Sequence, residues 1–359
     1  MRIVRRYYVK EFLKVLGITA IGLSLIFGLL DLIDKIDDLM PRKPSVAQFF
    51  LYIIYSLPKY LYYLLPMSLL ICSLFIFSQA SRNKELVAIR CAGGRLTKLF
   101  HPFIILGLVS SLLGFFMGEI VTPAFSERNR ELRSALKSKG GKLKMKEGTI
   151  WLKGKDGSLI RLGLYIPDEE YASEISVFVL GESVVKERIE AEAAEWVQHS
   201  QSEGVWKFKN ANIYDMDSGK VRKLHEMDYA YLEAPDFFSE QIKKPDEMGL
   251  FELFDYSERL KAAGFNNPKL SVDISSKISY PFTNFFMLML GISLSVCSTV
   301  RGGLFATGLG LFLSFIYWLG YTFMLSMGYA GIIPAAAATW TVPLAFGIVA
   351  FYFFWKMPV

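Results

Sequence analysis

One charged segment of this sequence combines residue types that could bind another protein. In SRNKELVAIRCAGGRLTKLF, residues 81–100, Glu85 is the single acid among five basic residues. An isolated carboxylate in such a setting can seek a basic group across an interface. Two interpretations remain open, namely a loop whose basic residues only set membrane topology, or a helix that docks a soluble partner.

The same segment is expected to be helical. Residues 84–92 contain no Pro or Gly, and Gly93-Gly94 would end the helix. A docking surface on this helix would combine one apolar stripe with two charges beside it. Its residues are Glu85, Leu86, Ile89, Arg90 and Gly93.

A second charged group is basic and lies at the end of the third long apolar run and the start of the fourth. Its residues are Arg130, Arg133 and Lys137, together with Lys277. An arginine guanidinium can hold a phosphate through two hydrogen bonds, so this group could bind an anionic headgroup. Ordinary snorkelling at a lipid interface, or an internal pair between Asp273 and Lys277, would explain the same residues.

The sequence offers little support for catalysis by this chain. It contains no GxxxxGK[ST] phosphate loop, no HExxH and no GxSxG, and its three histidines are scattered. Its three cysteines form no CxxC, so no zinc site is expected. Glu119, in FFMGEIVTPAF, is the most conspicuous acid in an apolar run. It could act in a proton relay or make a structural hydrogen bond.

Composition and hydropathy indicate a membrane protein. Of the 359 residues 52% are hydrophobic, and the mean hydropathy is +0.32, which is high for a soluble domain. A membrane-spanning helix needs roughly 20 apolar residues. Six runs are long enough, near residues 13–36, 48–80, 99–124, 272–298, 304–326 and 334–355.

Basic residues in the short connections predict the orientation. They gather before the first run, between the second and third, between the fourth and fifth, and after the sixth. By the positive-inside rule both termini and the segment 82–98 face the cytoplasm. The polar region 125–271 then lies on the opposite side. Its alternating apolar residues and frequent turn signals predict an antiparallel β domain, either a sandwich or jelly-roll-like.

Several stretches, in order along nearly the whole chain, resemble the LptF/LptG permease family of lipopolysaccharide exporters. The longest is SLPKYLYYLLPMSLLICSLFIFSQASRNKELVAIRCAGG, whose SLPK is closer to the LptG branch. The others are GEIVTPAF with the basic residues after it, GTIWLKGKDG, SSKISYPF and YAGIIPAAAATWTVP. The chain is therefore expected to be an α-helical integral membrane protein of the bacterial inner membrane. Its domains would be helices 1–3 (1–124), a periplasmic antiparallel β, jelly-roll-like domain (125–271) and helices 4–6 (272–359).

The resemblance also implies function and partners. Such permeases pair LptF with LptG on a cytoplasmic LptB ATPase dimer and pass lipopolysaccharide to LptC and LptA through joined β domains. The chain itself would need no cofactor, because the ATPase binds ATP and Mg. By motif position Glu85 matches the acid of the coupling helix, and Arg130, Arg133 and Lys277 match basic positions near the lipid phosphates.

One departure from the family pattern concerns the outer end of the first run. The family often carries basic residues there, whereas DLIDKIDDL supplies Asp31, Asp34, Asp37 and Asp38 around Lys35. A direct phosphate contact from this end is therefore not expected. An ion-driven secondary transporter and a membrane-anchored scaffold are the alternative functions.

Overall fold

The protein divides into two compact units in the computed structural model, and each unit is described by itself. The first comprises Met1–Leu132, Pro245–Phe254 and Asn267–Val359, and the second comprises Arg133–Lys244 and Asp255–Asn266. The structure describes residues 2–36, 45–94, 96–137, 144–146, 149–154, 156–166, 170–180, 185–200, 203–216, 219–232, 235, 245–262, 267–297 and 302–357.

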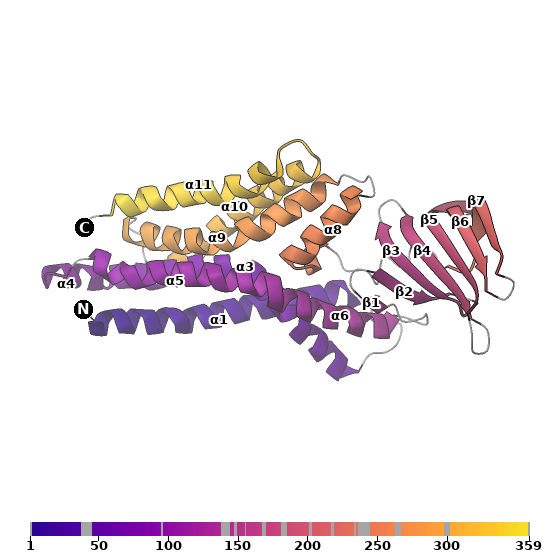
Figure 1. Ribbon diagram of the computed structural model, residues 1–359. Helices are drawn as coiled ribbons and strands as arrows, with labels where there is room; N and C mark the ends of the chain where they lie inside the picture. Colours follow the sequence, from indigo (N-terminus) through magenta and orange to yellow (C-terminus); the bar gives the residue numbers. More distant parts are fainter. Residues whose placement is uncertain are drawn as a thin grey trace. The chain divides into compact units, whose positions relative to one another are not determined.

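The first unit is a helical bundle whose long helices run side by side (Figure 1). Among the described residues six helices are long and apolar enough to cross a membrane, which confirms the predicted six spans. The third span is composite, because α5 continues through a π-helical turn, η2, into α6. The bounds are α1 (Arg2–Asp34), α3 (Val46–Arg82), α5 (Leu96–Phe116), η2 (Met117–Val121), α6 (Thr122–Lys137), α9 (Pro268–Cys297), α10 (Gly303–Tyr329) and α11 (Ala335–Trp355).

Helices α3 and α9 form the interior of the bundle. In the most apolar 18-residue stretch of α3 72% of residues are buried, and in α9 61%, against 11–28% in the other four spans. Buried serine hydroxyls in both helices donate hydrogen bonds to backbone carbonyls of the preceding turn. The Ser73 hydroxyl donates to the carbonyl of Leu69 at 2.7 Å, and the Ser293 hydroxyl donates to that of Met289 at 2.6 Å. Small residues with satisfied polar groups let two helices approach closely in an apolar interior.

Gly291 marks the closest approach between these two central helices. A Cβ atom at this position would lie 1.8 Å from the Ser73 hydroxyl oxygen and 2.9 Å from the Leu70 carbonyl oxygen. The second contact is with backbone, which has little room to move. Only glycine therefore fits at this crossing.

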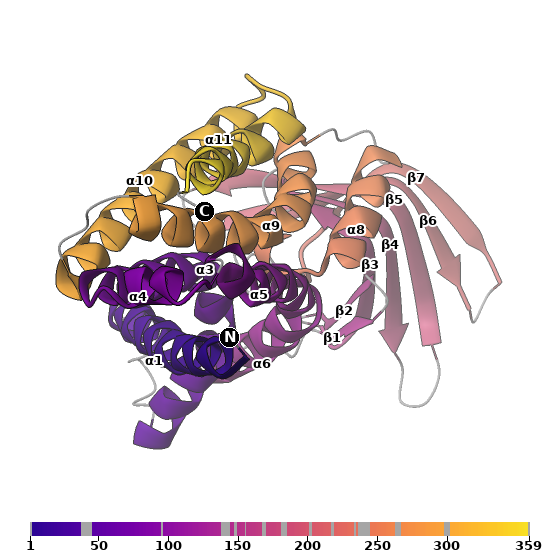
Figure 2. The ribbon, with the colours of Figure 1, turned by 90° about the vertical axis from the view of Figure 1, so that its left-hand side faces the viewer.

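Both chain termini lie at one end of the bundle, next to the short helix α4 (Glu85–Cys91) (Figure 1). Figure 2 views the bundle from that end and shows α1, α4 and α5 near the N-terminus. This placement agrees with the charge-based expectation that the termini and residues 82–98 share one side.

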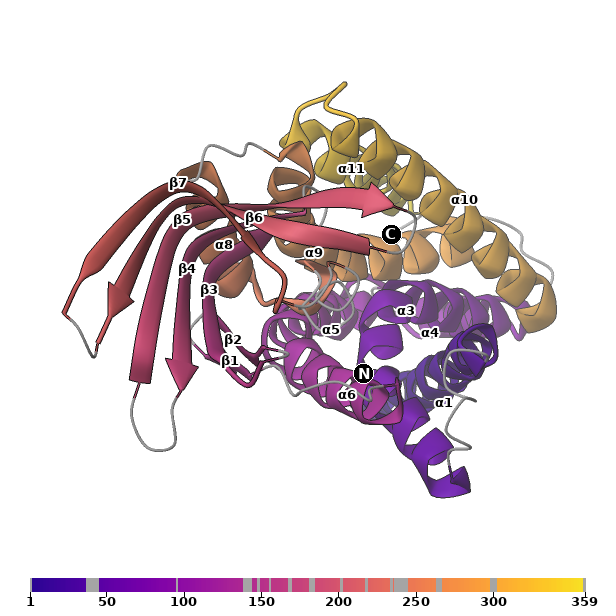
Figure 3. The same ribbon diagram turned by 90° about the vertical axis from the view of Figure 1, so that its right-hand side faces the viewer.

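The second unit is built on one antiparallel sheet that curves strongly (Figure 3). Its seven strands pair in sequence order, β1 to β7. The antiparallel β domain is thus confirmed, and the strand order refines the jelly-roll-like expectation: the described strands form a meander without a crossover. They are β1 (Lys144–Lys146), β2 (Thr149–Lys153), β3 (Leu159–Ile166), β4 (Tyr171–Leu180), β5 (Val185–Ser200), β6 (Glu203–Asp215) and β7 (Val221–Tyr229).

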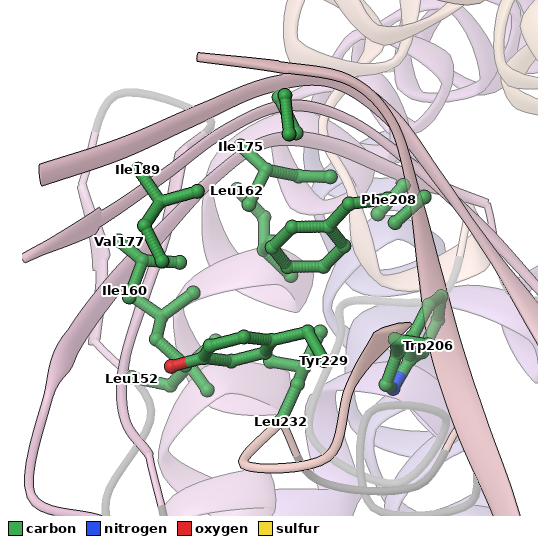
Figure 4. Close-up of a cluster of buried hydrophobic side chains, with 14 of the residues drawn as sticks. Leu152, Ile160, Leu162, Ile175, Val177, Ile189, Trp206, Phe208, Tyr229 and Leu232 are labelled. Atoms are coloured by element: carbon green, nitrogen blue, oxygen red, sulfur yellow. The ribbon is translucent and has the colours of Figure 1, made fainter. Parts of the chain in front are cut away.

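The core of the sheet lies on its inner, concave side (Figure 4). Alternate residues of each strand point there, such as Ile175 with Val177 and Trp206 with Phe208, all at most 1% exposed. Register reinforces the alternation, because Val177 stands opposite Ile189. The Tyr229 ring stacks on Phe208, with centroids 4.9 Å apart, and burial raises its phenol pKa to about 12.

Two short helices complete the connection that follows the sheet. They are a 3-10 turn, η4 (Pro245–Glu247), and α8 (Leu250–Ala262). The segment GLFELFDYSERLKAAGF contains α8, which alternates apolar and charged residues. Its first turn belongs to the helical unit, where it meets the third span.

Candidate functional site

Helix α4 is held by defined turns at both ends. Lys84, just before it, adopts a left-handed conformation (φ +59°) that separates α4 from the end of α3. At its other end Gly93 has φ +77°, a region that favours glycine, and the Gly94 N–H donates to the carbonyl of Ile89 at 2.9 Å. The prediction of a short helix ended by Gly93-Gly94 is confirmed.

The apolar stripe of α4 faces the bundle. Leu86 is 5% exposed and belongs to a buried cluster with Tyr8, Phe77 and Phe100, and Ile89 packs against that cluster. Leu86 therefore anchors the helix, and Ile89 is half-buried beside it. Val87, which sequence reasoning missed, is 53% exposed and lies on the outer side.

Glu85 stands at the first position of α4 and accepts two hydrogen bonds. The Tyr8 hydroxyl donates to its Oε2 at 2.5 Å, and the Asn83 side chain donates to its Oε1 at 3.2 Å. The side chain remains partly exposed. A carboxylate has about four acceptor positions, so Glu85 can still receive a basic group from outside the chain.

Arg90 lies near the other end of α4 and is only partly satisfied. Its Nε and Nη2 atoms are buried, and no described residue accepts a hydrogen bond from them. A buried donor without an acceptor is costly, about 1–3 kcal/mol and more for charged groups. Arg90 is therefore a half-buried cation whose guanidinium is incompletely hydrogen-bonded by the described residues.

At the opposite end of the bundle, Glu119 sits within the π-helical turn η2 and caps α8. Its carboxylate accepts the backbone N–H of Leu250, and that of Phe251 at 3.4 Å. The first turn of a helix leaves N–H groups unsatisfied and carries a partial positive charge, which favours a carboxylate there. These contacts support the structural alternative for Glu119.

Gly249 permits this capping contact. A Cβ atom there would lie 2.9 Å from a carboxylate oxygen of Glu119 and 3.2 Å from its backbone oxygen. The extra residue of a π turn changes which way the side chain points, and such turns are frequent at functional sites. The third span and α8 are thus joined at one fixed point.

For the second charged group, the structure describes the side chains of Arg130 and Lys277. Arg130 is half-buried, and its Nη1 atom has no hydrogen-bond partner among the described residues. Arg133 and Lys137 lie in α6, but their side chains fall outside the described residues. Lys277 is half-buried on α9.

Lys277 lines a cavity of about 120 Å³ within the helical unit. One turn away on α9, the Asp273 carboxylate accepts the Tyr329 hydroxyl at 2.7 Å. The other lining side chains are mainly hydroxyl-bearing, namely Tyr62, Tyr63, Thr122, Ser276, Tyr280 and Tyr321. The wall can therefore offer hydrogen bonds as well as one ammonium group to a polar molecule.

The acidic end of α1 makes internal contacts. The Asp31 carboxylate accepts the Tyr52 hydroxyl at 2.5 Å and pairs with Lys35. Asp34 is exposed, whereas Asp37 and Asp38 lie outside the described residues. Asp31 therefore ties α1 to α3 within the bundle.

Replacing Glu119 by Ala should loosen the start of α8. Loss of both N–H contacts is expected to cost about 1–3 kcal/mol, so the Leu250 and Phe251 amides should exchange hydrogen faster. Hydrogen exchange with mass spectrometry measures this directly. The control Glu258→Ala removes an exposed acid from the same helix and should leave these amides unchanged. Equal protection in Glu119→Ala and the unmodified protein would contradict the capping role.

Comparison with known proteins places the chain in a family. A family model described as "Lipopolysaccharide export system permease LptF/LptG" matches residues 6–356. The "Lipopolysaccharide export system permease protein LptG" of Escherichia coli (strain K12) is 20% identical over 291 residues, which cover 80% of this chain and 79% of that protein. The protein of the same description from Escherichia coli O6:H1 matches equally, and an uncharacterized Rickettsia prowazekii protein is 23% identical over 190 residues, 50% of this chain and 52% of that protein. The chain belongs to the LptF/LptG family of lipopolysaccharide export permeases, which are multi-pass membrane subunits of a transporter.

Proposed function

We propose that this chain is an LptG-type permease subunit of an ABC exporter that extracts lipopolysaccharide from the bacterial inner membrane. It pairs with an LptF-type permease, has no catalytic site of its own, and uses ATP and Mg bound by a separate LptB-type ATPase dimer. The family match over residues 6–356 and the two LptG relatives support this assignment.

The observation that carries the proposal is the construction of α4. A charged helix is fixed at one end of an apolar bundle by Leu86, while Glu85 remains accessible beside it. Glu85 receives a basic group of the ATPase, and the half-buried Arg90 side chain adds a positive charge to the same helix. Gly93 ends the helix and frees the chain to return into α5.

The charge distribution supports a cytoplasmic position for this end. Basic residues occur at the start of α1, around α4 and at Lys356 after α11, all near the same end of the bundle (Figure 2). Both termini are then cytoplasmic and the β domain is periplasmic. An edge strand of that domain, β7, is largely exposed and can add a strand from an LptC- or LptA-type protein.

The outer helices provide the apolar surface for lipid and for the partner permease. Large exposed side chains line them, including Ile18 on α1, Phe312 on α10 and Ile348 on α11, each at least 60% exposed. Acyl chains bind such surfaces through burial of about 0.8 kcal/mol per methylene. The bilayer offers the same burial, so extraction requires energy from ATP hydrolysis.

Basic residues hold the phosphorylated head of the lipid. Lys277 supplies an ammonium group beside the hydroxyl-lined cavity, and Arg130 has an unsatisfied guanidinium nitrogen. Arg133 and Lys137 extend this group along α6. Closure of the ATPase dimer moves α4, and the bundle then pushes the lipid toward the β domain.

Proteoliposomes that contain the two permeases and the ATPase separate this proposal from its alternatives. An exporter releases lipopolysaccharide to a soluble acceptor only when ATP is supplied. Release driven by an ion gradient without ATP would instead indicate a secondary transporter, and no release under either condition would indicate a scaffold.

Reversing the charge at Lys277 should weaken headgroup binding. The Lys277→Glu substitution replaces an attraction for phosphate with a repulsion, so photocrosslinking of lipopolysaccharide to the complex should fall at least about tenfold. Lys269→Glu, at an exposed position on the same helix, is the matched control and should crosslink normally. An unchanged signal in Lys277→Glu would argue against the headgroup site.

Removing the acid of α4 should uncouple the ATPase. Glu85→Ala deletes the proposed charge contact, for which about 1.5–3 kcal/mol is expected, or roughly a tenfold or greater loss of bound ATPase. Copurification and lipid-stimulated ATP turnover measure this loss. The control Glu11→Ala removes an acid of α1, a different helix, and should retain both copurification and turnover. Normal copurification and turnover in Glu85→Ala would overturn the docking role.

A further inference from the structure

We propose that Tyr8 is a positioning residue for Glu85, which it holds in the orientation that ATPase docking requires, and that it thereby ties α1 to α4. This inference rests on the proposed function. It adds a residue 77 positions earlier in the chain, outside the segment that carries the docking helix.

The contact between the two side chains is short and directional. The Tyr8 hydroxyl donates to the Oε2 atom of Glu85 at 2.5 Å, and Asn83 donates to Oε1 at 3.2 Å. Hydrogen bonds to an ionised carboxylate are shorter and stronger than neutral ones. With a donor on each oxygen, the carboxylate cannot rotate freely, so its remaining acceptor positions point in a fixed direction.

The ring of Tyr8 is itself fixed by packing. Tyr8 is 4% exposed, and its ring stacks on Phe77 of α3 with centroids 6.0 Å apart. Leu86 of α4 belongs to the same buried cluster. The hydroxyl is therefore presented by a rigid group of α1, and the cost of ordering it is met when the bundle folds.

The consequence is a mechanical link between the docking helix and the first span. A force that the ATPase applies to Glu85 reaches α1 through the Tyr8 hydroxyl and through the packing of Leu86. Helix α3 is linked to α4 as well, by the short connection at Lys84 and by the packing of Leu86 against Phe77 in the same cluster. Displacement of α4 should therefore move the start of α1 with it.

The test compares Tyr8→Phe with the unmodified protein in the complete permease–ATPase complex in proteoliposomes. The substitution keeps the buried ring and removes only the hydroxyl. We expect the complex to assemble and unfold thermally as before, while lipopolysaccharide released per ATP hydrolysed falls about tenfold. Tyr7→Phe, at a position 59% exposed, removes a hydroxyl from the adjacent residue and should keep the normal ratio.

A double-variant comparison separates positioning from a general structural effect. If Tyr8 acts through Glu85, Tyr8→Phe should have little further effect in a Glu85→Gln background. Additive losses, a normal ratio in Tyr8→Phe, or failure of that variant to assemble would each overturn the inference. If Glu85→Ala uncouples ATP hydrolysis from lipid release while Tyr8→Phe behaves normally, only the positioning role of Tyr8 is refuted. If Glu85→Ala is fully coupled, the docking function itself fails.

Discussion

The structure depends on one buried contact region, where α4 is anchored to the bundle. A helix with exposed charges cannot rest in lipid, and seven residues cannot fold alone. Leu86 holds the helix against the bundle, because its side chain packs into a buried cluster with residues of α1, α3 and α5 and with Met357 near the C-terminus. The cluster fixes the position of Glu85, and it also joins the ends of α1, α3 and α5 next to α4, so that these ends respond together to any force on α4.

The same logic operates at the opposite end, where Glu119 caps the first turn of α8. Both glutamates serve as ionisable acceptors with two described donors each, and both join segments that are distant in sequence. Between them, the close crossing of α3 and α9 at Gly291 gives the bundle a tightly packed interior. The bundle is thus anchored by a glutamate at each end and tightly packed between them.

Local patterns in the sequence predicted the elements but not their long-range contacts. The six spans, α4 with its glycine stop, and the alternating strands follow from hydropathy, turn residues and charge. The Tyr8–Glu85 bond was missed because a tyrosine near a basic terminus carries no local signal of its partner. The π turn at Glu119 was also missed, because its capping contact is with a residue 131 positions later in the chain, for which FFMGEIVTPAF carries no local signal. The stripe containing Leu86 was correctly identified, but the sequence could not tell which side it faced. The side chains of Arg133 and Lys137 lie outside the described residues, so their role remains a prediction.

Because the Tyr8–Glu85 hydrogen bond and the Leu86 cluster join α4 to the start of α1, we expect these two segments to move as one body during the ATPase cycle. Spin labels at the exposed Cys91 and at Ile3→Cys (Ile3 is 85% exposed), with Cys72 and Cys297 replaced, report their separation in the reconstituted complex. A reference pair joins Ile3→Cys to Leu304→Cys on α10, in a chain that also lacks Cys91. We predict that trapping the ATPase with vanadate shifts the reference distance and leaves the Cys91–Ile3 distance unchanged. A nucleotide-dependent change in the Cys91–Ile3 distance would contradict the account.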